Sequence, residues 1–489
     1  MKETRFKQIN TNVYQMKHKY YKVFLLMLFL ILNLLLMIAS LNLASEAWIT
    51  KIAYLSIFQL GINIIALNVL GEKVFSVSVI FLFLSWIFHF GNIIIIGFKF
   101  NPELTFEIVT ALSEDTIKET MRFSFFVQSF VAFGMFFVRV FVKERSTALS
   151  IKIEEEENYL YLIRNLGIIL VIIGIGPTFY IDIGKIILFF QTGYVSTFSL
   201  SQNGYLILLA RLFKVGIFLL IIGYKNKPKI ATTIFITILI YQLFIMISGN
   251  RGRSMVEIIG LLFLYTNIIR QIKFKNLFAY GSLFYLMITV LNALSMFRQK
   301  QSPSIGEFLR SLTESFRESP IIMMLYEFGG TIITVCYSIM YFSENNHVQY
   351  GANYILSFLT IFPNFMGVLE SVHSNAIYIS LYPESYRSFL GGSYIGELYF
   401  SFRNFGIPFA LLIGIFISIF SRKIQQAINY KKYILLSVLI IILPDILWWI
   451  RGYFIEIVRY PIWISLVIFI LFNFLKKKQG IKKFKAKVI

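Results

Sequence analysis

Five arginines lie at the ends of long apolar segments, and their side chains are well suited to binding phosphate. They are Arg251, Arg253, Arg298, Arg403 and Arg451. A guanidinium presents a planar fork of donors that fits two phosphate oxygens at once, whereas a lysine ammonium offers a point charge. The use of arginine therefore favours recognition of a phosphate or pyrophosphate. The alternative is that each arginine contacts ordinary lipid phosphates at the end of a membrane span.

The stretch SGNRGR, residues 248–253, predicts an anion-binding turn in front of a helix. Gly249 and Gly252 allow a ligand to approach the backbone closely. Asn250 or Ser254 is able to cap the helix that follows. The free backbone N–H groups and the dipole at that helix N-terminus favour an anion. Glycines and arginines together thus predict a cradle for phosphate.

A second cluster, FLGGSYIGELYFSFRNFG at residues 389–406, carries a carboxylate into an apolar segment. Ser393 is able to cap a helix, which would place Glu397 one turn inside it. A carboxylate at a membrane edge needs a partner. Glu397 either acts on a sugar hydroxyl, by orienting it or as a general base, or it forms a salt bridge to one of the arginines. Asn404 is a further candidate for hydrogen bonds to a sugar. Asp445, which follows a proline, is either functional or breaks and caps its helix.

The stretch 298–403 has an aromatic and polar character suited to binding sugars. Tyr350 is a candidate for stacking on a sugar ring. His347 and His373 are candidates for a general base. Glu327, in the sequence YEFGG, is a carboxylate on an otherwise apolar segment and a candidate for glycan binding.

Other chemistries lack their sequence signatures. There is no phosphate-binding loop of the Walker type, and no His/Cys spacing that would hold a metal. No paired aspartates of a nucleotide-sugar site are present, and no Ser–His–Asp order is convincing. We therefore expect neither a metal nor another cofactor.

The elements that position these residues are membrane spans. The apolar fraction is 57% and the charged fraction 15%, against about 25% charged residues in soluble chains. The apolar segments lack the alternation of barrel strands. We predict an all-α, polytopic membrane protein whose residues 1–489 form one membrane domain. The net charge of +21 is concentrated in tails and loops, which argues against nucleic acid as a partner. The basic tail 476–489 is predicted to lie in the cytoplasm near anionic lipid.

About twelve spans are predicted from the apolar segments. They are 21–42, 48–70, 74–98, 122–142, 161–181, 204–224, 229–248, 254–270, 276–297, 403–421, 432–450 and 455–475. A basic N-terminus favours the cytoplasmic side. Alternate counting then places both termini and the lysine-rich loops inside, and all five arginines outside.

The long stretch 298–403 is predicted to be an external loop between spans nine and ten. Two parts of it, 321–342 and 353–369, are apolar enough to enter the membrane. They are either two further spans, which would make about fourteen, or re-entrant or amphipathic helices. Irregular backbone at membrane depth is tolerated only where protein or a wet cavity surrounds it.

These features together resemble a known family. The sequence SGNRGR opening a span, Arg298 ending the next, YGANYILSFLTIFPNF at 350–365, GGSYIGELYFSFRNFG at 391–406 and WWIRGYF at 448–454 are similar to the Wzy-type oligosaccharide repeat-unit polymerases. The two external arginine loops usual in the family are only partly matched. The resemblance implies a metal-independent glycosyltransferase of the bacterial plasma membrane that builds O-antigen, capsule or exopolysaccharide.

The resemblance also implies the substrates and the roles of residues. The donor would be a glycan on undecaprenyl pyrophosphate and the acceptor the next lipid-linked repeat unit. The pyrophosphates would be held by Arg251, Arg298 and Arg451, assisted by Arg253 and Arg403. Glu397 or His373 would assist the acceptor hydroxyl. Besides this substrate and membrane lipids, a chain-length regulator and a flippase are expected partners.

Two other functions fit part of the pattern. A flippase for lipid-linked oligosaccharides would share the substrate, but it should place charges along a central cavity and often shows internal repetition. The unusual charges here gather on one face, and no repeat is visible. An O-antigen ligase would use similar chemistry with a different acceptor.

Overall fold

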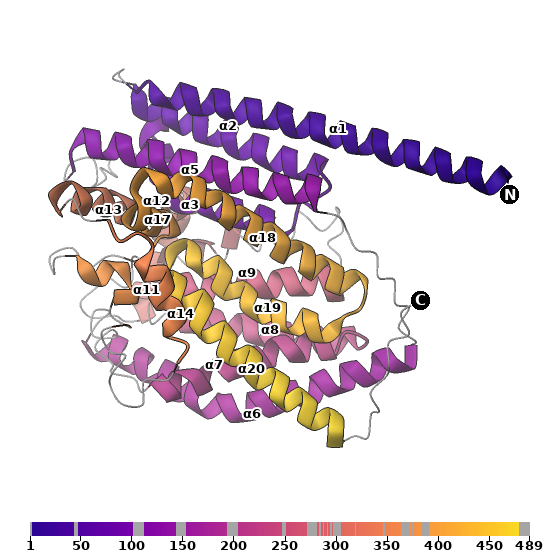
Figure 1. Ribbon diagram of the computed structural model, residues 1–489. Coiled ribbons are helices and arrows are strands. Elements are labelled where there is room, and N and C mark those ends of the chain that lie inside the picture. The colour runs from indigo at the N-terminus through magenta and orange to yellow at the C-terminus, as the bar shows by residue number, and fades with distance from the viewer. Residues whose placement is uncertain are drawn as a thin grey trace.

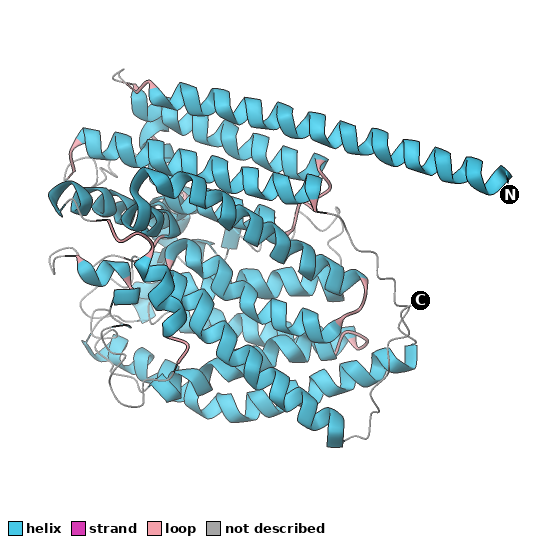
Figure 2. Ribbon diagram, viewed as in Figure 1, coloured by secondary structure: helices cyan, strands magenta, loops and turns pink. Residues whose placement is uncertain are grey.

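Helices make up almost all of the described chain, and no strand occurs in it (Figure 2). The computed structural model describes residues 2–43, 47–100, 112–142, 153–192, 204–246, 251–270, 305–317, 319–345, 348–362, 375–382 and 391–478, with 281–282, 285–286, 288–290, 292–293, 296 and 372. Side chains are not described for 2–19, 153–155, 251, 305 and 345. The prediction of an all-α protein is confirmed.

Long helices form a bundle (Figure 1). They are α1 (Lys2–Leu41), α2 (Trp48–Val69), α3 (Val77–Phe98), α5 (Glu114–Phe141), α6 (Ile153–Thr192), α7 (Gly204–Gly223), α8 (Pro228–Ile245), α9 (Arg251–Leu264) with the π-helix η3 (Tyr265–Ile269), α18 (Gly406–Asn429), α19 (Tyr433–Trp448) with the 3₁₀ turn η7 (Trp449–Arg451), and α20 (Phe454–Lys478). Their apolar sequences and lengths suit the hydrocarbon thickness of a bilayer.

Shorter helices gather at one end of this bundle, which we call the cap end (Figure 1). They are α11 (Ile305–Arg317), α12 (Pro320–Gly329), α13 (Ile332–Asn345), α14 (Ala352–Leu359), η5 (Tyr378–Leu381), α17 (Tyr394–Phe402) and η6 (Arg403–Phe405). The N-terminus and the end of α20 lie at the opposite end, which we call the tail end.

Twelve helical segments of the described chain are long and apolar enough to cross a membrane, as the sequence predicts. The set differs from the predicted one. The predicted ninth span, 276–297, lies mostly outside the described residues, and Pro320–Glu344 takes its place among the twelve. The predicted segment 353–369 contains α14, which at eight residues is too short to span, and 363–369 lies outside the described residues.

The segment 320–344 is not one continuous helix. A turn at Gly330 and Thr331 separates α12 from α13. Helix α12 packs on α3 at very close range, because a Cβ on Gly91 would lie 2.4 Å from the carbonyl oxygen of Leu325 and one on Gly329 would lie 2.3 Å from the amide nitrogen of Asn92. Glycine at both positions therefore fixes α12 against the bundle.

Helix α17 is the most deeply buried of the short helices, since residues 394–401 are all buried. Ser393 caps it, as the sequence predicts, with its hydroxyl accepting from the amide of Gly396. The same hydroxyl bonds to Nε2 of the buried His89 on α3 at 2.8 Å. The helix ends at Arg403, where φ is 52°, and α18 begins at Gly406 rather than at the predicted residue 403.

Candidate functional site

Glu397 lies one turn inside α17 and is completely buried. Its carboxylate accepts hydrogen bonds from the side-chain amide of Asn353 at 3.0 Å, the indole N–H of Trp449 at 3.3 Å and the backbone N–H of Phe454 at 3.1 Å. These donors come from α14, η7 and the start of α20. Three separate elements thus converge on one carboxylate.

The partners of Glu397 are all neutral. Within the described residues no cation pairs with it, so of the two alternatives left open by the sequence, the salt bridge to an arginine is not formed there. A buried carboxylate without a counter-ion is costly to keep in a fold, and such groups concentrate at functional sites. The arrangement suits a group that exchanges a proton more than one that fastens two helices.

Arg451 lies beside the N-terminal approach to α17. Its Nε would lie 3.5 Å from a Cβ placed on Gly391. The next residue, Gly452, meets Gly392 backbone to backbone, because a Cβ on Gly392 would lie 2.3 Å from the carbonyl oxygen of Gly452. Two glycines therefore bring the turn after α19 against the chain that leads to Glu397.

Arg253 lies within a network of carboxylates rather than in an open cradle. Its guanidinium donates to Asp445 at 2.9 Å and lies 3.8 Å from both Glu257 and Glu456. The ring of Trp448 lies 5.9 Å from it. Trp448 and Glu456, which both lie near Arg253, also flank Gly452, the residue after Arg451. Arg253 and Arg451 therefore lie on the side of α17 toward which Glu397 points.

The network extends into the neighbouring helices. Arg211 on α7 contacts Asp445 at 3.4 Å and stacks over Tyr460 at 3.5 Å. Lys214 pairs with Glu257 at 2.7 Å. A small cavity of about 60 Å³ lies among these side chains. In the described part of the chain the network combines four cations with four carboxylates, namely Lys185, Arg211, Lys214, Arg253, Asp182, Glu257, Asp445 and Glu456.

The sequence offered two candidates for the cap of α9 and two roles for Asp445. Ser254 does not cap α9, because it lies inside the helix, where its hydroxyl is buried without a partner. Asn250, the other candidate for the cap, lies outside the described residues. Asp445 does not end its helix, because α19 continues through Pro444 to Trp448. Asp445 instead joins the ion network.

Arg403 and Asn404 lie at the other end of α17, in the turn η6, and both are exposed. The Arg403 guanidinium lies 3.3 Å from the centre of the Phe342 ring, and that ring meets Tyr399 of α17. Nine residues of helix separate the two ends of α17, which corresponds to about 13 Å. The predicted arginines with described side chains thus divide into two groups, with Arg253 and Arg451 at one end of α17 and Arg403 at the other.

The remaining predicted residues are spread over the cap end or lie outside the described residues. Tyr350 is 81% exposed and precedes α14, which carries Asn353. Glu327 is half-buried on α12. Arg251 begins α9, but its side chain is not described. Arg298, His347 and His373 lie outside the described residues.

The buried Tyr378 holds the cap-end chain against the start of α17. The Tyr378 hydroxyl accepts from the amide of Ser393 and donates to its carbonyl oxygen, both at 3.2 Å. Burial raises the pKa of Tyr378 well above its usual value, and it does the same for Tyr354, with the nearby charge of Glu397 as a second cause. Both hydroxyls therefore keep their protons.

Several residues of this site were not singled out from the sequence. Charges within apolar segments are rare and point to buried networks, so Arg211 and Lys214, three residues apart in LARLFKVGIF, carried a readable signal. Glu257 and Glu456 carried the same kind of signal. Asn353 and Trp449 have no such mark, because only the fold brings them to Glu397.

A protein family described as O-antigen polysaccharide polymerase Wzy matches residues 21–483 of the chain. No curated protein and no solved structure matches it.

Proposed function

Because the chain belongs to the Wzy family of O-antigen polysaccharide polymerases, we propose that it joins repeat units carried on undecaprenyl pyrophosphate at the outer face of the bacterial plasma membrane. The family makes it an integral membrane enzyme of glycosyl transfer that polymerises lipid-linked repeat units. The lipid carrier, the side of the membrane and the residue roles are our proposals.

Glu397 is the observation that carries the residue roles. It is a fully buried carboxylate held by neutral donors, on a short helix at the cap end. A group in this setting is suited to take a proton from a sugar hydroxyl. We assign the general base to Glu397, with His373 as the second candidate.

The reaction is an exchange of one C–O bond for another. The oxygen of the acceptor's non-reducing-end hydroxyl attacks the anomeric carbon of the donor sugar. The bond from that carbon to the pyrophosphate oxygen breaks, and its electron pair leaves with undecaprenyl pyrophosphate. The hydroxyl proton passes to Glu397.

The leaving group carries negative charge, which guanidinium groups stabilise without a metal. Arg451 and Arg253 lie on the Glu397 side of α17, and Arg251 begins the same helix as Arg253. These three, with Arg298, are assigned to the pyrophosphate of the leaving group. Arg403, at the other end of α17, is assigned an assisting role in binding substrate pyrophosphate. We propose that the reaction is metal-independent.

Glycan contacts are assigned to exposed or half-buried residues around α17. Tyr350 and Asn404 are exposed at the cap end, and Glu327 lies on α12. Each offers stacking or hydrogen bonds to sugar rings. A chain-length regulator and a flippase are proposed as protein partners.

Sidedness follows from the distribution of lysine. The tail end carries Lys225, Lys227 and Lys229, and Lys476–Lys478, and short basic loops favour the cytoplasm. We therefore place both termini inside and the cap end outside. Cys336 is the sole cysteine and is buried, so maleimide labelling reports on the introduced cysteine. An impermeant maleimide added to whole spheroplasts should label Phe405→Cys and not Lys227→Cys, and the reverse pattern would overturn this orientation.

Purified protein with lipid-linked repeat units tests the function itself. A polymerase gives a ladder of products that differ by one repeat unit. A ligase gives a single transfer, and a flippase gives transport without joining. Either of the last two results would contradict the proposal.

A further inference from the structure

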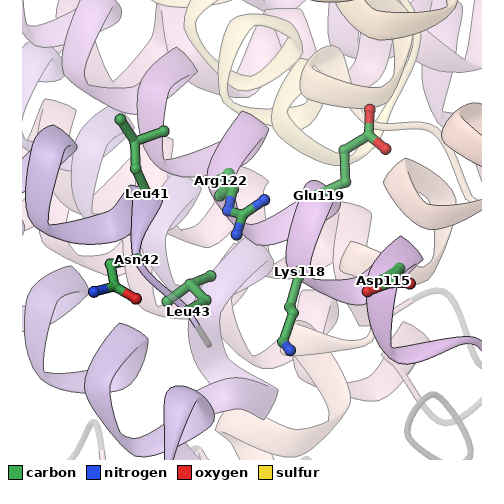
Figure 3. Close-up of a pocket in the computed structure, with 7 residues that line it drawn as sticks. All are labelled: Leu41, Asn42, Leu43, Asp115, Lys118, Glu119 and Arg122. Atoms are coloured by element: carbon green, nitrogen blue, oxygen red, sulfur yellow. The ribbon is translucent and has the colours of Figure 1, made fainter. Parts of the chain in front are cut away.

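A second cavity lies at the cap end, between the end of α1 and the first turns of α5. Its volume is about 420 Å³, within the range of sites for small molecules. Figure 3 shows Arg122 between the α1 end and the other charged side chains of α5. The cavity is lined by Leu41, Asn42, Leu43, Asp115, Lys118, Glu119 and Arg122.

Arg122 has no protein partner in the described chain. Its Nε is buried and makes no hydrogen bond. Lys118, one turn earlier, differs, because it pairs with Glu114 at 2.7 Å and lies near the ring of Trp48. Native structures satisfy most buried polar groups, so a buried guanidinium nitrogen without a partner calls for an explanation. A ligand with acceptor oxygens would supply one.

The chemistry of the cavity changes with depth along α5. Asp115 and Glu119 are exposed at its rim. Arg122 lies seven residues after Asp115 on the same helix, which is about 10 Å deeper. Leu41 and Leu43 form the apolar wall. Carboxylates suit sugar hydroxyls, a guanidinium suits phosphate, and leucines suit hydrocarbon. These are the three kinds of chemical group in a lipid-linked oligosaccharide.

Tyr399 connects this cavity to α17. Its hydroxyl donates to Glu119 at 2.8 Å, and its ring meets Phe123 edge-on at 4.9 Å. Tyr399 and Glu397 are two residues apart on one helix, so their side chains point about 200° apart. The Arg122 cavity therefore lies on one side of α17, and the group formed by Arg253 and Arg451 lies on the opposite side.

We propose that the Arg122 cavity binds the diphosphate of a second lipid-linked substrate, while the side of α17 that carries Arg253 and Arg451 binds the first. This rests on the proposed function, because joining two lipid-linked chains requires both to be bound at once. Arg403 lies on the Arg122 side as well, over Phe342 and near Tyr399. Helix α17, with Glu397, then lies between the two lipid-linked substrates.

Binding stoichiometry tests the proposal. Full-length protein in phosphatidylcholine nanodiscs is titrated with undecaprenyl pyrophosphate and read by native mass spectrometry. We expect two equivalents for the wild type and one for Arg122→Gln, whose second site weakens by about tenfold or more. Arg122→Lys, which keeps the charge, should lie between. Arg310→Gln is the matched control, since Arg310 is 82% exposed and paired with Glu314, and it should bind two equivalents.

Two results would overturn the proposal. One is two equivalents bound by Arg122→Gln at wild-type affinity. The other is loss of the Arg122-dependent equivalent when phosphatidylglycerol replaces phosphatidylcholine, because the cavity would then bind any anionic lipid phosphate. Inorganic pyrophosphate in place of the lipid shows whether the tail contributes, and equal affinity without the tail would overturn assignment to a lipid-linked substrate.

Product formation separates this proposal from the proposed function. If the wild type makes no ladder from lipid-linked repeat units, the proposed function fails. If it makes the ladder and Arg122→Gln does so with unchanged KM and unchanged stoichiometry, only the second-substrate site fails. The expected result is a raised KM for Arg122→Gln with a smaller change in kcat.

Discussion

The two sides of α17 differ in how their arginines are satisfied. On one side, Arg253 is surrounded by three carboxylates, at 2.9 to 3.8 Å. On the other, Arg122 faces a cavity of about 420 Å³ and has no partner in the described chain. The first arrangement is compensated by the protein itself, whereas the second depends on a ligand.

This difference shows that burial of an arginine does not by itself identify an anion-binding site. A compensated network stabilises helix packing and must exchange partners before it can bind phosphate. An uncompensated guanidinium can bind phosphate without breaking an ion pair. The first site should therefore respond to mutation in stability and activity together, and the second in binding and activity alone.

The largest effect should come from Glu397→Gln, which tests whether the two sides share one reaction centre. A general base contributes about 10²- to 10⁴-fold, so polymer formation should fall by at least about 100-fold. Binding of undecaprenyl pyrophosphate to both sides should persist. The measurement is the product ladder from purified protein, with stoichiometry by native mass spectrometry.

The control for Glu397→Gln is Glu314→Gln, a partly exposed carboxylate on α11, which should leave the ladder unchanged. Glutamine cannot accept all three hydrogen bonds, and an unsatisfied buried donor costs about 1–3 kcal/mol. The thermal midpoint is therefore measured alongside. A stable Glu397→Gln protein that makes polymer at the normal rate would remove Glu397 from the chemistry.

A smaller effect, on stability, should separate the two arginines. Arg253→Ala leaves buried carboxylates with one cation fewer, and breaking such a pair costs about 3 kcal/mol. Arg122→Gln breaks no ion pair and should change stability by less than about 0.5 kcal/mol. Thermal unfolding in matched detergent compares the two variants. Equal destabilisation by both would contradict the contrast between the two sides.

A double variant sharpens this result. Arg253→Ala with Glu456→Gln restores the balance of charge in the network, because Glu456 lies 3.8 Å from Arg253. Stability should recover in large part, while polymer formation stays low if Arg253 also contacts pyrophosphate. Recovery of both would assign Arg253 a purely structural role.

The sequence predicted the architecture better than the pairing of side chains. Twelve spans and the cap at Ser393 could be read from apolar length and residue type. The sequence left open whether Glu397 pairs with an arginine, because its partners come from α14, η7 and α20, more than 40 residues away on either side. Only the packing of these elements on α17 determines which donors reach it.

Arg122 illustrates the same limit. In the sequence it looks like any basic residue near the start of a span, and the predicted span begins at this residue. Helix α5 in fact begins at Glu114, so Arg122 lies two turns inside the helix and faces the end of α1. Neither the depth of Arg122 within the helix nor its lack of a partner can be read from the amino-acid sequence.

The smallest expected effect concerns Tyr399→Phe, and it tests why Arg122 is left without a partner. Glu119 and Arg122 are three residues apart on α5, a spacing at which side chains pair. The Tyr399 hydroxyl instead holds the Glu119 carboxylate, which points away from Arg122 (Figure 3). Without that hydroxyl, Glu119 is free to pair with Arg122, and such pairs are worth about 0.2–0.5 kcal/mol.

The Arg122-dependent affinity for undecaprenyl pyrophosphate should then fall about twofold, with little change in stability because the Phe ring keeps its contacts with Phe123 and Phe342. Adding Glu119→Gln to Tyr399→Phe removes the competing carboxylate and should restore the affinity. A loss that persists in the double variant would mean that Tyr399 shapes the cavity by packing. Rescue would establish it as the positioning residue that keeps the guanidinium available for phosphate.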